Sequence, residues 1–181
     1  MIESIDDVLD VLASGGREAY FGEPVTVLEH SLQAAWFVQR KNAESSLVVA
    51  ALLHDFGHLL HEEGEDAASR GIDTHHEDLG VEALKDHFPA EVLNPIHLHV
   101  AAKRYMCFAE TRYLAALSPA SVQSLRLQGG PMSSAEAEAF LASPHALAAI
   151  ALRHADDAAK VQGLAVPALD SYRPLVEALW R

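Results

Sequence analysis

Residues 48–60, VVAALLHDFGHLL, combine an unbroken apolar run with an adjacent His-Asp pair. The run from Val48 to Leu53 predicts a buried helix, because consecutive apolar side chains leave no polar face for solvent. His54 and Asp55 follow directly, and His58 comes one turn later. Since burial penalises unpaired polar groups, this placement requires a physical reason.

A metal ion is one reason for the pair. Neighbouring side chains on a helix point about 100° apart. His54 and Asp55 can therefore reach the same point only near the end of the helix, and only if an atom or ion lies between them. Imidazole and carboxylate are good ligands for iron, manganese or zinc. The alternative is a buried histidine bonded to a carbonyl beside a capping aspartate. The pair alone does not decide between the two.

The length and composition favour one globular domain over residues 1–181. Half of the 181 residues are hydrophobic, which is enough for one core and argues against bulk disorder. No apolar run approaches the roughly 20 residues that span a bilayer, so no membrane partner is expected. The acidic first residues lack a basic n-region, and the single cysteine, Cys107, fits a reducing compartment. These features predict a cytoplasmic protein.

The formal net charge of −13 limits the ligands that the protein can bind. An acidic surface repels phosphate backbones, which makes nucleic acid a poor partner. It also repels a small anionic substrate at long range. Such a substrate would therefore need local cations or a metal to hold it. The sequence gives no indication of the oligomeric state.

Helical periodicity recurs along the chain and strand signals are nearly absent. The longer helical segments are 4–16, 27–41, 46–53, 78–88, 90–106 and 144–163, with shorter ones after residue 110 and at 171–180. Pro95 could bend the segment 90–106. Capping boxes are predicted at Thr26 with Glu29, Thr74 with Glu77 and Ser133 with Glu136. The fold class is therefore all-α, a helical bundle of about nine helices.

Further candidate ligands follow the His-Asp pair at intervals along the chain. His30 and His99 lie in apolar helical segments, His76 precedes a glutamate, and Asp156 lies in LRHADDAAK. Each one alone has a structural explanation, as a core histidine, a helix cap or a solvated charge. The ordered series is harder to explain in that way, and it favours a metal site.

The series resembles the HD-domain superfamily, which is named for a His…His-Asp…Asp metal site. The minimal set corresponds to His30, His54, Asp55 and Asp156. The resemblance implies that His76 and His99 complete a dinuclear site in which Asp55 bridges the two metals. His76 is preferred over His75 because the family pattern is a histidine followed directly by a glutamate.

A narrower resemblance extends from about residue 20 to residue 160. The segments YFGEPVTVLEHSLQAAWF, AALLHDFGH, HHEDLGVEAL, HVAAKRYM, YLAALSPASVQSL, LQGGPM and DDAAK are similar to the organophosphonate-cleaving, mixed-valent diiron oxygenases (PhnZ-type enzymes), which are relatives of myo-inositol oxygenase. This resemblance implies two irons in the Fe(II)/Fe(III) state and O2 as co-substrate. It also implies cleavage of the C–P bond of a zwitterionic substrate, 2-amino-1-hydroxyethylphosphonate or its N-trimethyl analogue, to glycine or glycine betaine and phosphate.

The same resemblance implies roles for residues around the metals. Tyr20 is expected to occupy an iron position at rest, and Glu23 to release it by binding the cationic nitrogen of the substrate. Without the resemblance, a core tyrosine beside a loop glutamate would be the simpler interpretation. The phosphonate is expected to be bound by Lys103, Ser121 and Ser124, with His58 and Gln128 as further candidates.

An alternative function stays open at this point. HD-domain phosphohydrolases, which act as phosphomonoesterases or nucleotidases, share the metal ligands and use a metal-bound hydroxide instead of O2. They do not share HVAAKRY followed by QGGPM, so the oxygenase is favoured. Arg104 and the remaining histidines are expected to be structural or solvated: His61, His75, His87, His97, His145 and His154.

Overall fold

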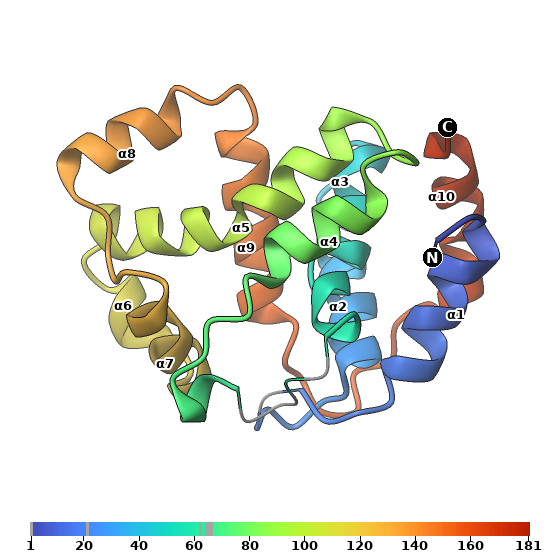
Figure 1. Cartoon of the computed structure of the whole chain (residues 1–181), viewed down its shortest axis with the longest axis horizontal. Helices are drawn as coiled ribbons and strands as arrows, with labels where there is room; N and C mark the ends of the chain where they lie inside the picture. Colours follow the sequence, from blue (N-terminus) through green and yellow to red (C-terminus); the bar gives the residue numbers. More distant parts are fainter. Residues whose placement is uncertain (1, 21, 62, 64–66) are drawn as a thin grey trace.

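The computed structural model describes residues 2–20, 22–61, 63 and 67–181. Within these ranges the chain forms ten α-helices, three short 3-10 helices and no β-strand, with one isolated bridge between Ala19 and Thr26 (Figure 1). The prediction of an all-α bundle of about nine helices is confirmed. In the described part of the chain, no helix has both the length and the apolar character needed to cross a membrane.

Four helices form the centre of the molecule: α2 (Val27–Gln39), α3 (Ser45–Leu53), α5 (Ala90–Ala109) and α9 (Ala146–Ala158). α2 packs against α3 and α9, and α5 packs against the same two helices from the other side. α3 is buried on nearly every face from Val48 to Leu53, as the apolar run predicts. The polar residues that follow α3 are therefore held inside the bundle.

Two of the elements that follow α3, a 3-10 helix and an α-helix, pack with their backbones unusually close together. The 3-10 helix η1 (Phe56–Leu59) lies against α4 (His76–Leu84). A Cβ atom on Gly57 would overlap the backbone carbonyl of His76, and Gly80 faces Gly57 across the same contact. Only two glycines allow the two backbones to approach this closely. The contact places His76 beside the end of α3.

The outer helices lie at two ends of the molecule. α1 (Ile5–Gly15), η3 (Leu169–Ser171) and α10 (Arg173–Leu179) lie at the end where both termini are found (Figure 1). α6 (Tyr113–Ala116), α7 (Pro119–Leu127) and α8 (Ser134–Leu141) lie at the opposite end. The 3-10 helix η2 (Ala68–Arg70) contacts α7.

Two of the three predicted capping boxes are present. Thr26 and Ser133 each accept a hydrogen bond from the backbone N–H of the glutamate three residues on, and each glutamate bonds back. The predicted box at Thr74 was wrong, because α4 begins one residue later than the box requires.

The N-cap of α4 is His75, in a left-handed conformation with φ 47° and no side-chain cap. The side chain of Glu77 lies beside the ring of His76, with its Oε2 3.4 Å from Nδ1, instead of reaching back to a capping residue. Pro95 does not interrupt α5, which remains one helix from Ala90 to Ala109.

Candidate metal centre

The His-Asp pair lies where the chain leaves a helix. α3 ends at Leu53, His54 is its C-cap residue, and Asp55 precedes η1. Both side chains are buried, and His54 Nε2 lies 3.3 Å from Asp55 Oδ2. The change from α to 3-10 geometry turns two neighbouring side chains toward the same point, which a continuous helix would not do.

His54 meets His30 of α2 through their Nε2 atoms, which are 3.1 Å apart. The Nδ1 atoms contact backbone carbonyls, at 2.9 Å on Ala159 for His30 and 2.8 Å on Ala51 for His54. A carbonyl only accepts hydrogen bonds, so each Nδ1 carries a hydrogen, and in the neutral form of either ring Nε2 is the nitrogen that offers a lone pair. Two lone pairs at this distance would repel each other, so either a proton on one ring or a metal cation near both nitrogens is required.

A second pair has the same arrangement. His76 at the start of α4 and His99 of α5 bring their Nε2 atoms within 3.0 Å. His99 Nδ1 donates to the carbonyl of Ile96 at 2.6 Å. Metal-binding histidines are commonly oriented in this way, with the second nitrogen bonded to a carbonyl or carboxylate.

Asp55 lies between the two histidine pairs. Its Oδ2 is 3.4 Å from His30 Nε2 and 3.3 Å from His54 Nε2, and its Oδ1 is 3.4 Å from His76 Nε2 and 3.7 Å from His99 Nε2. Burial opposes ionisation of this carboxyl, but the charge of His54 and hydrogen bonds from His30 and His54 hold its pKa well below the usual value. Asp55 therefore presents one anionic oxygen to each pair.

Asp156 of α9 joins the first pair. Its Oδ2 is fixed by the guanidinium of Arg153 at 2.6 Å. Its Oδ1 is buried without a hydrogen-bond partner among the described residues and lies 3.5 Å from His30 Nε2. A buried carboxylate oxygen without a donor is costly, and a cation bound between Asp156 and His30 would remove that cost.

The pKa values of the ligands fit metal binding. Burial lowers the pKa of His99 to about 3 and the pKa of His76 well below its usual value, so both rings are neutral and can bind a metal at neutral pH. His54 differs: burial alone would lower its pKa, but the charges of Asp55 and Asp156 raise it to about 9. A metal ion at the first pair would therefore displace the proton of His54 and balance the charges of Asp55 and Asp156 in its place.

The donors form two groups that could each hold a metal ion, and the groups share Asp55. One contains His30, His54 and Asp55, and the other contains Asp55, His76 and His99. Imidazoles and carboxylates together suit iron, manganese or zinc. The residues present therefore fit a pair of transition-metal ions.

A cavity of about 300 Å³ opens beside this centre. Its wall includes metal-site residues and residues from the 20–26 loop, η1, α5, α7 and the end of α9. All of the residues predicted to gate the site or bind substrate line it: Tyr20, Glu23, His58, Lys103, Ser121, Ser124 and Gln128. The structure thus brings together side chains from five separate parts of the chain.

Ring stacking connects the cavity wall to the metal centre. Tyr20 stacks on His30, with ring centroids 3.9 Å apart, and its hydroxyl donates to Asp55 Oδ2 at 2.7 Å. His58 stacks on His76 at 3.8 Å, and burial lowers the pKa of His58 to about 4. His58 is therefore neutral at neutral pH.

Two lysines supply positive charge to the cavity. Lys103 of α5 is buried, and its Nζ donates to Ser124 Oγ at 2.9 Å. Burial and the nearby Arg153 lower the pKa of Lys103 to about 7. Lys160, just after α9, donates to Ser121 Oγ at 3.2 Å and lies 3.7 Å from Glu23 Oε1. These cations are the local charges that an anionic substrate of an acidic protein requires.

Sequence reasoning did not assign Arg153 or Lys160 to the site. Arg153 is buried at 4% exposure and binds Asp156, Asp157 and the hydroxyl of Tyr113. An arginine one turn before a ligand aspartate, inside an apolar helix, is a signal that could have identified it. Lys160 offered no comparable signal, because its partners come from distant segments.

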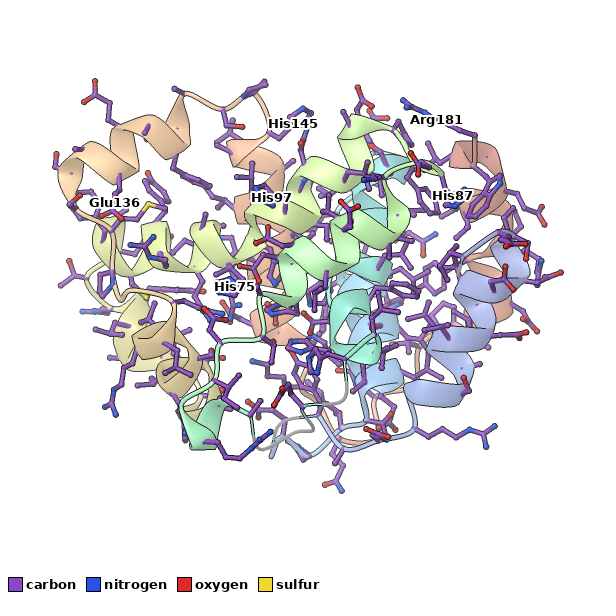
Figure 2. All side chains as sticks on the ribbon, in the orientation of Figure 1. His75, His87, His97, Glu136, His145 and Arg181 are labelled. Carbon is purple, nitrogen blue, oxygen red and sulfur yellow. The ribbon has the colours of Figure 1, made fainter. Side chains whose placement is uncertain are left out.

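The histidines outside the site are dispersed. Figure 2 shows His75, His87, His97 and His145 at separate places, with His145 toward the top of the view and His87 in its right half. His87 stacks on Trp180 and bonds the carbonyl of Ile2, and His97 pairs with Asp78 at 3.1 Å. Arg104 forms an ion pair with Glu136 at 2.6 Å. These contacts are structural or at the surface.

Comparison with known proteins adds independent information. The HD domain family model matches residues 27–156. The chain is 37% identical over 179 residues to [1-hydroxy-2-(trimethylamino)ethyl]phosphonate dioxygenase (glycine-betaine-forming) of Leisingera caerulea, which covers 99% of this chain and 90% of the relative. It is 41% identical over 177 residues to hydroxymethylphosphonate dioxygenase of Gimesia maris, covering 97% and 88%. An uncharacterized protein of Acanthamoeba polyphaga mimivirus is 31% identical over 178 residues, covering 97% and 81%.

Proposed function

This chain belongs to the HD-domain family, and we propose that it is an oxygenase that uses O2 to cleave the C–P bond of a hydroxyphosphonate. The observation that carries the proposal is two groups of candidate ligands, with four imidazoles between them, that share Asp55 and lie with Asp156 beside a cavity that contains Lys103 and two serines. Two similar proteins are named as phosphonate dioxygenases. A redox metal pair next to an anion-binding cavity suits that reaction.

The metals are proposed to be two irons, in the Fe(II)/Fe(III) state. His30, His54 and Asp156 would hold one, His76 and His99 would hold the other, and Asp55 would bridge them. When bound, the pair supplies Lewis-acid polarisation of the substrate and the redox chemistry with O2. The hydrogen bonds from Nδ1 to backbone carbonyls keep Nε2 of His30, His54 and His99 available to the metals.

The proposed substrate is a 1-hydroxy-2-ammonioethylphosphonate, with either a free or a trimethylated nitrogen. One similar protein is named for the trimethylamino compound, and the other for hydroxymethylphosphonate, which has no nitrogen. In this chain Glu23 supports a cationic substrate, because its Oε1 is buried in the cavity wall without a hydrogen-bond partner among the described residues. A buried carboxylate oxygen pairs well with an ammonium group.

The phosphonate would bind to the positively charged and hydroxyl side chains of the same cavity. Lys103 and the hydroxyls of Ser121 and Ser124 supply a cation and neutral donors, and His58 and Gln128 also line the cavity. A phosphonate accepts several hydrogen bonds at once, and converging donors therefore fix its orientation. The carbon that bears the hydroxyl and the phosphonate would then face the metal centre.

Tyr20 is proposed to gate the centre. Its hydroxyl donates to Asp55 Oδ2, and the charges of Asp55 and Asp156 together with burial raise its pKa well above the usual value. Glu23 follows three residues later in the same loop, and its N–H donates to the carbonyl of Tyr20 at 2.7 Å. Movement of Glu23 toward a bound ammonium would therefore be transmitted to Tyr20.

The reaction balances without an external reductant. The substrate loses its C–H and C–P bonds, and O2 accepts the four electrons. One oxygen atom enters the carboxylate, which also keeps the original hydroxyl oxygen, and the other enters the phosphate. The protein is required only to orient the substrate and to exclude other reductants.

The test compares phosphate release in air and under argon. Iron-loaded protein is incubated with each of three compounds: 2-amino-1-hydroxyethylphosphonate, its N-trimethyl analogue and hydroxymethylphosphonate. We expect phosphate only in air, with one O2 consumed per phosphate. Equal release under argon would instead identify an HD-domain phosphohydrolase, and a redox-inert metal such as zinc would then support turnover.

A further inference from the structure

The cavity contains an ion pair that joins the two ends of the proposed substrate site. Lys160 Nζ lies 3.7 Å from Glu23 Oε1, and both side chains are only slightly exposed, at 13% and 14%. Glu23 belongs to the loop between α1 and α2, and Lys160 follows the end of α9. The residue proposed to bind the substrate nitrogen therefore already has a cation beside it.

The same lysine also reaches the phosphonate side. Lys160 Nζ donates to Ser121 Oγ at 3.2 Å, as Lys103 Nζ donates to Ser124 Oγ at 2.9 Å. The two serines are one turn apart on α7, so their hydroxyls lie on the same helix face. Two lysines thus approach this pair of hydroxyls, Lys103 from α5 and Lys160 from the segment that follows α9.

Because one ammonium group lies between a carboxylate and the anion-binding hydroxyls, its charge is shared between two competing partners. We propose that Lys160 is a second phosphonate-binding cation that Glu23 holds back, and that a substrate ammonium releases it by taking its place on Glu23. This inference rests on the proposed function and names the residue that couples recognition of the nitrogen to recognition of the phosphonate.

The coupling gives the site a preference for zwitterions. A ligand that carries both an ammonium and a phosphonate pairs its ammonium with Glu23. Lys160 is then free to pair with the phosphonate. An anion without a nitrogen, such as inorganic phosphate, leaves Lys160 paired with Glu23. Lys103 alone is a weak anchor for such an anion, since its lowered pKa of about 7 leaves it only partly protonated at neutral pH. Inorganic phosphate should therefore bind less tightly than a zwitterionic phosphonate.

A double-mutant cycle tests the coupling without turnover. Calorimetry under argon measures the affinity of iron-loaded protein for inorganic phosphate in the wild type, Glu23→Gln, Lys160→Met and the double variant. Lys160→Arg keeps the charge and serves as the conservative variant. Lys85→Met, which removes an exposed lysine paired with Glu82 on α4, serves as the matched control. Circular dichroism and iron content establish that each variant is folded and loaded.

We expect Glu23→Gln to tighten phosphate binding several-fold, because it frees Lys160. Lys160→Met should weaken binding about tenfold or more after Glu23→Gln, which is the loss expected for one charge-assisted hydrogen bond. In the Lys160→Met background, Glu23→Gln should have little effect. Lys160→Arg should retain the response to Glu23→Gln, and Lys85→Met should change nothing.

The proposal is overturned if Glu23→Gln tightens phosphate equally in both backgrounds, because the effect would then be simple repulsion between Glu23 and the anion. It is also overturned if Lys160→Met leaves affinity unchanged in both backgrounds, or if phosphate binds none of the four proteins. The proposed function fails separately, when no hydroxyphosphonate is cleaved in air. If the effects of the two substitutions on phosphate affinity are non-additive but the protein cleaves no hydroxyphosphonate, the coupling between Glu23 and Lys160 stands and the oxygenase function is rejected.

Discussion

Asp55 shows how one residue can organise a whole site. Its two oxygens face different histidine pairs, at 3.3–3.4 Å on one side and 3.4–3.7 Å on the other. None of the other described carboxylates belongs to both groups of candidate metal ligands. Removing it should therefore affect both proposed metal positions at once, whereas removing Asp156 should affect one.

The first prediction concerns metal content. We expect Asp55→Ala to lose both irons, because each position loses an anionic ligand and the facing imidazoles are left without a counter-charge. Asp156→Ala should keep roughly one iron per chain, since the second histidine pair is untouched. Metal analysis of the purified proteins measures this, with Asp78→Ala as a surface control. An Asp55→Ala protein that still bound two irons would contradict the assignment.

The second prediction concerns Lys103 and pH. Its pKa of about 7 means that the ammonium form dominates below pH 7 and is lost as the pH rises through that value. Affinity for the phosphonate should fall over the same range, by about tenfold between pH 6 and pH 8 if the charged lysine is required. The measurement is KM against pH.

Lys103→Arg provides the comparison, because arginine stays protonated over this range. Titration of the phosphonate itself is the same for both proteins, so the difference between the two profiles isolates the lysine. Parallel profiles would exclude Lys103 as the titrating group.

At the scale of elements, the contact between η1 and α4 positions the second histidine pair. Gly57 has no space for a side chain, because a Cβ atom would overlap the carbonyl of His76. The backbone carbonyl cannot rotate away as a side chain would, so α4 itself must move. Since His76 is the first residue of α4, its ring would move with the helix.

The third prediction follows from this contact. Gly57→Ala should lower the free energy of unfolding by about 2–3 kcal/mol, within the usual cost of overpacking, and should reduce iron content toward one per chain. Gly15→Ala is the control, because its Cβ would meet only the flexible end of Leu59, at 3.2 Å. Chemical denaturation and metal analysis measure both effects. A Gly57→Ala protein as stable as Gly15→Ala would show that the helices can separate without cost.

At the scale of the whole molecule, the centre is held by packing from both ends of the chain. Tyr172, Val176 and the helices α2, α3 and α5 contribute to one apolar cluster. Arg173 of α10 pairs with Asp6 of α1 at 2.7 Å, and Figure 1 shows these two helices at the end of the molecule where both termini lie. The C-terminal segment therefore supports α3, whose end carries the His-Asp pair.

The fourth prediction tests this support through Tyr172. Its side chain is 1% exposed, and its hydroxyl has no hydrogen-bond partner among the described residues. Tyr172→Phe should leave stability unchanged or raise it by about 1 kcal/mol, because a buried hydroxyl without a partner is removed. Tyr172→Ala should cost about 3–5 kcal/mol through the cavity that it creates. A large loss in Tyr172→Phe, measured by denaturation, would reveal a partner for the hydroxyl.

Local patterns were sufficient for most of the helices. The apolar run before His54 predicted a buried helix, and two capping boxes identified the starts of α2 and α8. The box at Thr74 failed because α4 begins at His76, so that His75 and not Thr74 is the N-cap residue. The expected metal-ligand set depended on a resemblance over most of the chain, and its roles remain predictions.

The sequence by itself determined an all-α chain with four histidines and two aspartates in an order typical of one family, because helical periodicity and motif spacing are properties of neighbouring residues. Only the tertiary structure decided which histidines face each other, how Asp55 divides its oxygens, and that Lys160 lies between Glu23 and Ser121. Those contacts join residues far apart in the chain, such as His30 and Ala159. Their distances depend on how the helices pack, which no local pattern encodes.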